Sequence, residues 1–234
     1  MVSAIINGRL QKLQRAVDID NNGFTIGRGC LDSTFSLKNV LHSMREHGQE
    51  SWVAFIDLVK AFDSVDRTAM CDILLRYGAP QSLVTVIEGM HREVHMRMVI
   101  GDDFEDFESS IGVLQGAAAS PVLFNFVIDA WFSTMEWPDP PVVLHSDDGS
   151  EGPHSKVEGT EEVLLAHITN RGKAGTNVGN TVKVRDFKYA DDVAAVWRSR
   201  EAMQRGMAKL VSHGRRWGLE VHVAKAVDMV GYFR

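Results

Sequence analysis

The chain has little cysteine, no apolar run of membrane length and no leader-like amino terminus. Among its 234 residues are only two cysteines, Cys30 and Cys71. Their spacing fits neither a metal-binding pattern nor a disulfide framework, so we expect two buried thiols in a reducing compartment. No apolar run approaches a bilayer span, and the first residues lack the basic-then-apolar order of a signal peptide. These absences predict an intracellular protein, nuclear or cytoplasmic, with no membrane partner.

The chain also lacks an excess of positive charge. It carries 25 Lys and Arg against 31 Asp and Glu, a formal net charge of −6. This balance is unusual for a nucleic-acid enzyme, because Lys and Arg contacts to phosphates dominate nucleic-acid affinity. A nucleic-acid enzyme with this balance would need basic parts outside this chain; otherwise the chain does not bind nucleic acid tightly. A length of 234 residues allows one large domain or two small ones.

The hydrophobic periodicity predicts an α+β protein. Residues 1–22 should form a partly helical lead-in. We expect the next helix to be capped at Asp32-Ser33 and to end near Gly48, and the last to be capped by Ser199 and closed by Gly214 or Gly218. Between them we expect helices over Ser64–Tyr77, Gln81–His91 and Ser120 to about Glu136. The expected strands are Trp52–Leu58, Val94–Ile100, Phe104–Ile111, Val142–His145, Val182–Tyr189, Val193–Trp197, Leu219–Val223 and Val227–Phe233. Runs of strands interrupted by helices are typical of the α+β class.

One long stretch of the chain reads as an insertion. Residues 146–160 are rich in Gly, Ser and acidic residues, and 172–180 form a second flexible stretch after a possible helix over 161–170. Loops of that length are usually functional or disordered. We therefore expect a flexible insertion over 146–180.

Two acidic positions follow or precede apolar, strand-like runs. Asp57 follows Ser51–Ile56, and the pair Asp191-Asp192 lies between Val182–Tyr189 and Val193–Trp197. Carboxylates beside buried strands are costly unless they are paired or bind a metal. If the two strands are neighbours in one sheet, these carboxylates form a hard-oxygen site suited to Mg²⁺ and to two-metal phosphoryl transfer.

Three segments, in order, then resemble the catalytic motifs of reverse transcriptases of the non-LTR retrotransposon and group II intron type. They are Phe55-Ile-Asp-Leu-Val-Lys-Ala-Phe-Asp63, Leu114-Gln-Gly-Ala-Ala-Ala-Ser-Pro-Val-Leu-Phe-Asn125 and Tyr189-Ala-Asp-Asp192. An upstream element, Gly23-Phe-Thr-Ile-Gly-Arg28, is similar to the family's Gly-Phe-Arg-x-Gly-Arg. The resemblance implies RNA-templated DNA synthesis on a polymerase palm, an antiparallel sheet backed by helices, with a residual helical fingers segment.

The resemblance also assigns roles to residues. It makes Asp57, Asp191 and Asp192 the ligands of two Mg²⁺ ions, with Mn²⁺ as an alternative, and Lys225 a general acid near the triphosphate. Phe62 would be the steric gate that excludes a 2′-hydroxyl. Leu58 would offer its backbone carbonyl, Gln115 and Gly116 would pack under the incoming nucleotide and template base, and Tyr189 and Ala190 would lie beside the primer terminus. The implied partners are an RNA template, a DNA primer and dNTPs.

The chain departs from the family pattern at two places. Ala117-Ala-Ala119 stands where the family usually has a Pro, and Thr25 stands where it has an Arg. By the same resemblance, residues 1–50 correspond to partial fingers and 51–234 to the palm, with a fingers-like insertion within 64–115. No thumb is recognised, so we expect the fingers and thumb to come from a longer parent polypeptide.

Two alternatives stay open. The chain could be a catalytically inactive retroelement remnant that only binds nucleic acid or a protein partner, as Ala117–Ala119 and the acidic balance suggest. A template-independent nucleotidyl cyclase with a similar palm is more distant, because Gln115-Gly116 and Ser120-Pro121 argue against it.

Overall fold

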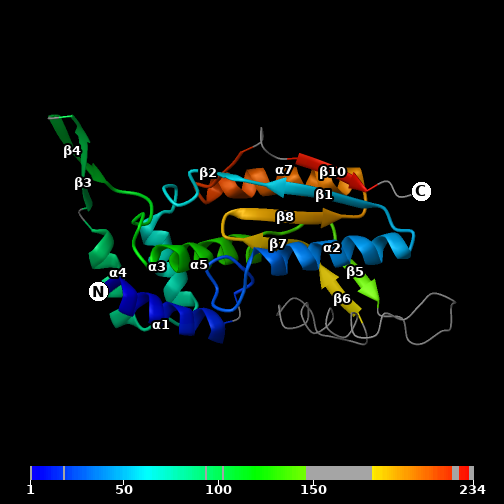
Figure 1. Cartoon of the computed structure of the whole chain (residues 1–234), viewed down its shortest axis with the longest axis horizontal. Coiled ribbons are helices and arrows are strands. Elements are labelled where there is room, and N and C mark those ends of the chain that lie inside the picture. The colour runs from blue at the N-terminus through cyan, green and yellow to red at the C-terminus, as the bar shows by residue number, and fades with distance from the viewer. Residues whose placement is uncertain are drawn as a thin grey trace.

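The computed structural model describes residues 2–17, 19–92, 94–101, 103–145, 181–222 and 227–231 (Figure 1). Its helices are α1 (Val2–Ala16), α2 (Cys30–Glu46), α3 (Arg67–Arg76), α4 (Gln81–His91), α5 (Ser120–Ser133) and α7 (Arg200–Arg216). Its strands are β1 (Ser51–Ile56), β2 (Leu58–Val59), β3 (Val94–Ile100), β4 (Asp103–Ser109), β5 (Val142–His145), β6 (Thr181–Val184), β7 (Asp186–Tyr189), β8 (Asp192–Trp197), β9 (Glu220–Val221) and β10 (Val227–Gly231). The predicted α+β class is confirmed. The expectations for 146–180 and for Lys225 lie outside the described residues.

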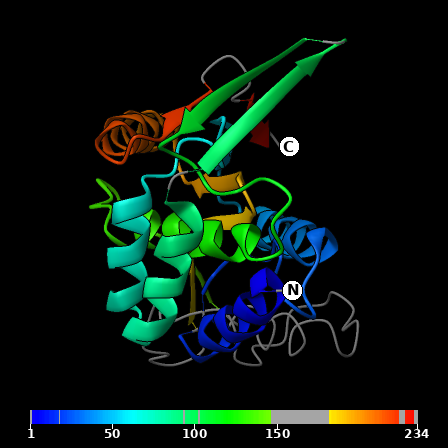
Figure 2. The same cartoon turned by 90° about the vertical axis from the view of Figure 1, so that its left-hand side faces the viewer.

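A four-stranded antiparallel sheet in the order β10-β1-β8-β7 forms the centre of the fold. Because side chains alternate between the two faces of a strand, each strand contributes to two cores. Trp52, Ala54 and Ile56 of β1 face the large core, which also contains α5 and α7. Val53 faces a smaller core with α2, β5 and β6. Helices therefore back one face of the sheet fully and the other only in part (Figures 1 and 2).

Helix boundaries follow from capping. The α4 helix spans Gln81–His91 as predicted, and Ser199 caps α7 by accepting a hydrogen bond from the Ala202 N–H at 3.1 Å. The α3 helix begins at Arg67 rather than at Ser64, because Asp66 is its N-cap and accepts from the Ala69 N–H at 2.7 Å. Residues 60–64, which precede it, form a turn.

Two strands expected to be continuous are each divided. Trp52–Leu58 divides at Asp57 into β1, which pairs with β8 and β10, and β2, which pairs with β9. Val182–Tyr189 divides at Arg185 into β6, paired with β5, and β7, paired with β8. The Arg185 guanidinium donates to the Asp139 carbonyl at 2.9 Å and lies 4.6 Å from the Trp137 ring centre. The first division matters for function, since it places Asp57 where the chain leaves the central sheet.

Three further observations concern surface features. The predicted hairpin is present as β3 and β4, which project from the body (Figure 2). Its residues Met98, Phe104 and Phe107 are exposed. Cys30, expected to be buried, is exposed at the start of α2, whereas Cys71 is half-buried. None of the described helices is both long and apolar enough to cross a bilayer.

A buried lysine anchors β7. The Lys188 side chain is only 5% exposed, and its Nζ lies 2.8 Å from Asp186 Oδ1 and 3.6 Å from Asp20 Oδ2. Burial alone would lower the pKa of Lys188, but the charges of Asp186 and Asp20 outweigh burial and raise it above 10.5. The ammonium group therefore stays charged and ties β7 to the segment that follows α1.

Replacing Lys188 by methionine should lower the free energy of unfolding by about 3–5 kcal/mol, because the two carboxylates lose their buried partner. Since the folded pKa is raised, the contribution of Lys188 should be constant below its ordinary value of 10.5 and fall at higher pH. Denaturant titration from neutral to alkaline pH checks both points. The control is Lys183→Met on the exposed side of β6, which should change the free energy by about 0.5 kcal/mol or less.

Candidate active site

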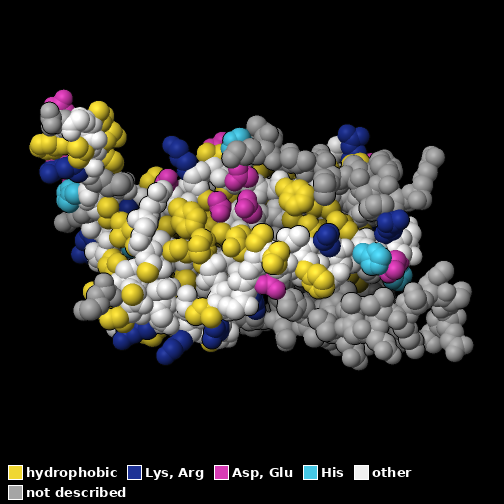
Figure 3. Space-filling model, in the orientation of Figure 1, with side chains coloured by type: hydrophobic (Ala, Val, Ile, Leu, Met, Phe, Trp, Pro, Cys, Tyr) yellow, Lys and Arg dark blue, Asp and Glu magenta, His cyan; other side chains and the backbone are white. Residues whose placement is uncertain are grey.

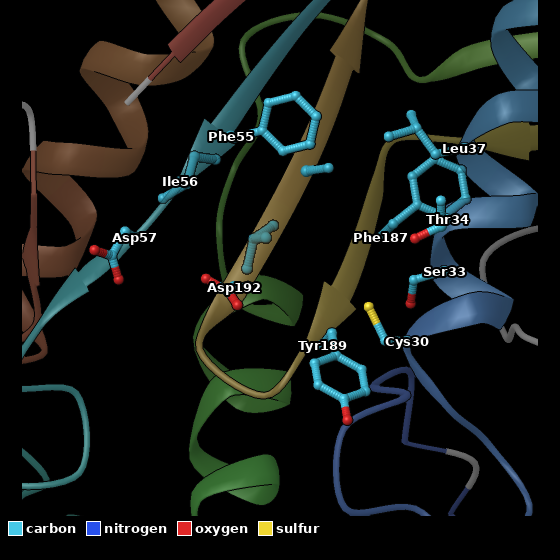
Figure 4. A pocket seen from close by; sticks show the side chains of 12 residues that line it. Cys30, Ser33, Thr34, Leu37, Phe55, Ile56, Asp57, Phe187, Tyr189 and Asp192 are labelled. Carbon is cyan, nitrogen blue, oxygen red and sulfur yellow. The ribbon is translucent and has the colours of Figure 1, made fainter. Parts of the chain in front are cut away.

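The fold brings two of the predicted ligands to adjacent ends of neighbouring strands. The antiparallel register of β1 and β8 ends with Ile56 opposite Val193, so Asp57 and Asp192 occupy the next position on each strand. Phe55 and Ala194 pair one step back and belong to the same face, the face that carries α2. Side-chain alternation therefore puts both carboxylates on one face of the sheet. Figure 4 shows them at the ends of β1 and β8.

Both carboxylates border one pocket of about 550 Å³. One side of the pocket is lined by the strand residues Phe55, Tyr189 and Asp192 and by Asp57 directly after β1. Residues from the first turns of α2 line the other side (Figure 4). On the molecular surface, acidic side chains gather over the end of β1 and the start of β8, among exposed apolar groups (Figure 3). Asp57 is half-buried and Asp192 is exposed, so a ligand in solution can reach both.

Asp191 occupies the turn that joins β7 to β8. Tyr189 pairs with Asp192, which leaves Ala190 and Asp191 as a two-residue hairpin turn. Asp191 is half-buried and does not line the pocket, whereas Tyr189 does. The turn thus places one carboxylate, Asp192, directly at the pocket and the second beside it.

The donor set fits a divalent cation that shares its coordination with a substrate. Within the described residues, no group of three or more His, Cys, Asp or Glu side chains is arranged to hold a metal ion. Mg²⁺ is commonly held by only one or two carboxylates together with substrate phosphates and water. Asp57 and Asp192, on one face and open to solvent, match that requirement.

Phe62 lies in an aromatic stack behind the turn that follows β2. Its ring stacks on Phe124 of α5 with centroids 4.5 Å apart, and Phe24 packs edge-on against it at 6.4 Å. Phe62 remains half-buried, so one part of the ring is accessible. Leu58 is 5% exposed and lies in β2, which pairs with β9.

The loop before α5 is held by the turn around Phe62. Gln115 Nε2 donates to Asp63 Oδ1 at 2.7 Å, and the Val113 N–H donates to the Phe62 carbonyl at 3.0 Å. Gly116 has a φ of +81° with nothing within 4 Å of the place where a Cβ would stand. Gln115 and Gly116 are both exposed to solvent.

The residues Ala117–Ala119 leave that loop ordered. The Leu114 carbonyl accepts from the Ala117 N–H at 3.2 Å and from Ser120 Oγ at 2.6 Å. The helix expected from Ser120 begins at that residue, with Ala119 as its N-cap. Hydrogen bonds within the loop thus provide the order that a proline ring would otherwise supply.

Sequence reasoning missed two buried asparagines beside the Tyr-Ala-Asp-Asp turn. Asn21 is 1% exposed and Asn125 is fully buried. Asn21 bonds to the backbone of Gly23 and Ala190, and Asn125 Nδ2 donates to the Gly23 carbonyl at 2.7 Å. The available signal was a lone amide within the apolar run Val122–Ile128, where a polar side chain needs a buried partner.

The Gly23–Arg28 element has a structural role in the described contacts. Thr25 Oγ1 donates to the Asn21 carbonyl at 2.6 Å and accepts from Gln14 Nε2 at 2.5 Å. Arg28 Nη1 donates to the Ile19 carbonyl at 3.4 Å. The threonine that replaces the family arginine therefore helps to fix the loop between α1 and α2.

Solved structures with a similar arrangement of helices and strands include telomerases. A structure of telomerase from Candida tropicalis in complex with a fragment of telomeric RNA aligns with 97% of this chain and 33% of its own, at a TM-score of 0.60 and 10% identity. An apo telomerase from the same organism, truncated from the C-terminal domain, aligns with 99% of this chain and 41% of its own at a TM-score of 0.58, also at 10% identity. The chain therefore has the mixed α+β fold of a polymerase palm.

The sequence itself identifies the family. The profile described as "Reverse transcriptase (RNA-dependent DNA polymerase)" matches residues 1–150, which include Asp57 and Gln115-Gly116. This chain belongs to that family.

Curated relatives place it in the retrotransposon branch. The Pol polyprotein of the type-2 retrotransposable element R2DM of Drosophila melanogaster is 33% identical over 120 residues, 50% of this chain. That of the type-1 element R2 of Nasonia vitripennis is 30% identical over 115 residues, 49% of this chain. The matched part spans 11% of the length of either relative. The reverse-transcriptase domain is therefore of the non-LTR retrotransposon type.

Proposed function

We propose that this chain carries the nucleotidyl-transfer site of an RNA-directed DNA polymerase, which extends a DNA primer along an RNA template. The observation that supports this most strongly is the placement of Asp57 and Asp192 on one face at the adjacent ends of β1 and β8, bordering one pocket. Family membership supplies the reaction class. The two carboxylates at the pocket would supply the negative charge that metal ions need in this reaction.

Asp57, Asp191 and Asp192 are the residues that would hold two Mg²⁺ ions, or Mn²⁺ in their place. When bound, such ions supply positive charge to the triphosphate and to the attacking 3′-hydroxyl. The Tyr189 ring lines the same pocket and would orient the primer terminus, with Ala190 leaving room beside it. Gln115 and Gly116 would support the incoming nucleotide and template base, the Leu58 carbonyl would face the nucleotide, and Lys225 would donate a proton to pyrophosphate.

The division into functional parts follows the same proposal. Residues 51–234 would form the palm, and residues 1–50 part of the fingers, with the β3–β4 hairpin as a fingers-like insertion within 64–115. The chain spans about a tenth of the length of the Drosophila and Nasonia relatives. Fingers and thumb surfaces that bind the duplex would therefore come from a longer polypeptide. Such surfaces would also explain how an acidic palm, with a net charge of −6, meets nucleic acid.

Primer extension tests the function directly. The chain, incubated with an annealed DNA primer on an RNA template, dNTPs and Mg²⁺, should lengthen the primer, and chelation by EDTA should stop it. Restoration of the reaction by Mn²⁺ is also expected. Retention of the RNA–DNA duplex in a filter-binding assay without extension would contradict polymerase activity and favour the inactive remnant. Cyclisation of a purine triphosphate without template would favour the cyclase.

Replacing Phe62 by valine should weaken discrimination against ribonucleotides. Removing the accessible part of the ring opens space for a 2′-hydroxyl, so the ratio of rNTP to dNTP incorporation should rise roughly 10- to 100-fold. Single-nucleotide incorporation with each triphosphate gives kcat/KM for the comparison. Phe107→Val, at an exposed position of the projecting hairpin, is the matched control and should leave the ratio unchanged. A ratio equally unchanged in Phe62→Val would show that Phe62 only packs.

A further inference from the structure

The backbone is unusual at three non-glycine residues of the described chain, and all three lie around the proposed site. Phe24, Lys60 and Ala190 have positive φ angles of 55°, 47° and 56°. Non-glycine residues rarely adopt this conformation, and it persists only where surrounding contacts enforce it. The Ala190 case is the most consequential, because Ala190 directly precedes the two aspartates of the turn.

The side chain of Asn21 makes the contacts that hold Ala190 in this conformation. Asn21 Nδ2 donates to the Ala190 carbonyl at 3.0 Å, and Asn21 Oδ1 accepts from the Ala190 N–H at 2.8 Å. The amide thus satisfies both backbone groups of Ala190, as a paired strand would. The same Oδ1 accepts from the Gly23 N–H at 2.8 Å. All these groups are buried, so breaking the contacts would leave polar atoms without solvent.

The loop that carries Asn21 is itself held by hydrogen bonds to the core elements α5 and β7. Asn125 of α5 donates to the Gly23 carbonyl, and the Asn22 N–H donates to the Lys188 carbonyl of β7 at 3.0 Å. The loop that carries Asn21 is therefore fixed to α5 on one side and to β7 on the other. A shift of the loop that carries Asn21 would move the turn, because the backbone of Gly23 lies directly against that of Ala190.

We propose that Asn21 is a positioning residue: its amide fixes the Ala190-Asp191 turn and so sets where Asp191 and Asp192 lie relative to Asp57. The expected effect on metal binding rests on the proposed function, whereas the expected effect on the turn does not. Groups that orient metal-binding side chains typically change metal affinity or activity by about 10- to 100-fold when removed.

The test compares Asn21→Ala with Asn22→Ala. Asn22 is the neighbouring buried asparagine, but its amide donates to Ser33 Oγ of α2 and not to Ala190. Both variants should lose stability. Only Asn21→Ala should accelerate amide hydrogen exchange of the peptide covering 189–192, by roughly tenfold or more, with α7 unaffected. Exchange in this turn that matches the wild type, or equal acceleration in both variants, would overturn the proposal.

A second measurement follows the consequence for the site. The Kd for Mn²⁺, measured by electron paramagnetic resonance with primer–template and a non-hydrolysable dNTP, should rise about 10- to 100-fold in Asn21→Ala and remain close to wild type in Asn22→Ala. If Asn21→Ala does not fold, Asn21→Ser keeps a small uncharged polar group in the site but is too short to bridge both backbone groups of Ala190. It should show the same two changes in smaller degree, and wild-type values for it would overturn the proposal.

The two proposals fail in different ways. A wild-type chain that neither binds Mn²⁺ nor extends a primer contradicts the polymerase function, yet the exchange of residues 189–192 still reports whether Asn21 fixes the turn. Conversely, an active chain in which Asn21→Ala exchanges and binds Mn²⁺ like the wild type contradicts only the role of Asn21.

Discussion

Replacing Asp57 or Asp192 by asparagine should reduce primer extension on an RNA template by about 10³-fold or more. Asparagine keeps the size of the side chain and removes the negative charge that a divalent cation requires, a loss of several kcal/mol of transition-state stabilisation. Both carboxylates border the pocket from one face of the sheet, so either substitution should be sufficient. The measurement is kcat/KM for single-nucleotide incorporation, with thermal unfolding as the check that each variant is folded.

Asp72→Asn is the matched control for this prediction. Asp72 is an exposed carboxylate on α3 and does not line the pocket, so its loss should leave incorporation unchanged. Asp191→Asn tests the turn residue separately and should also lower incorporation strongly if Asp191 is a ligand. Activity in Asp57→Asn within a fewfold of the wild type would remove the basis for the proposed site.

Gly23→Ala should strongly reduce primer extension by displacing the turn that carries the aspartates. A Cβ on residue 23 would stand 2.2 Å from the Ala190 nitrogen and 2.9 Å from its Cα, closer than van der Waals contact allows. Neither backbone can yield easily, since Asn21 and Asn125 hold both. We expect a loss of about 1–3 kcal/mol in unfolding free energy, typical of overpacking, and at least a 100-fold loss of incorporation.

Gly8→Ala provides the contrast. Gly8 lies within α1 with nothing within 4 Å of the place that a Cβ would occupy, so alanine should raise helix stability by about 0.5–1 kcal/mol. Incorporation should not change. Denaturant unfolding and primer extension on both variants separate a general effect of added methyl groups from the close approach at Gly23. Full activity in Gly23→Ala would mean that the turn tolerates displacement.

The sequence predicted those parts of the fold that local chemistry determines. The α4 helix and the β3–β4 hairpin were predicted because their periodicities are regular and their ends carry strong turn signals. The approximate meeting of Asp57 with the Asp191-Asp192 pair was also predictable, since both lie at ends of apolar strands. The division of Trp52–Leu58 at Asp57 was not predictable. There the chain changes its pairing partner from β8 to β9, and both of these strands lie far along the chain.

The residues that hold the site together were harder to predict. Asn21 and Asn125 act through backbone groups of Gly23 and Ala190, and such contacts join positions 169 and 102 residues apart. No local pattern encodes which backbone group a buried amide will meet. The replacement of the family arginine by Thr25 read as a loss from sequence alone, yet the threonine hydroxyl donates to the Asn21 carbonyl and supports that same loop.

The location of bound Mn²⁺ tests the central assertion most directly. A crystal structure of the chain with primer–template, a non-hydrolysable dNTP and Mn²⁺ would give the ion positions from anomalous scattering. We expect density between Asp57 and the Asp191-Asp192 turn, with carboxylate oxygens as ligands. Ions bound elsewhere, with Asp57 and Asp192 contacting none, would contradict it.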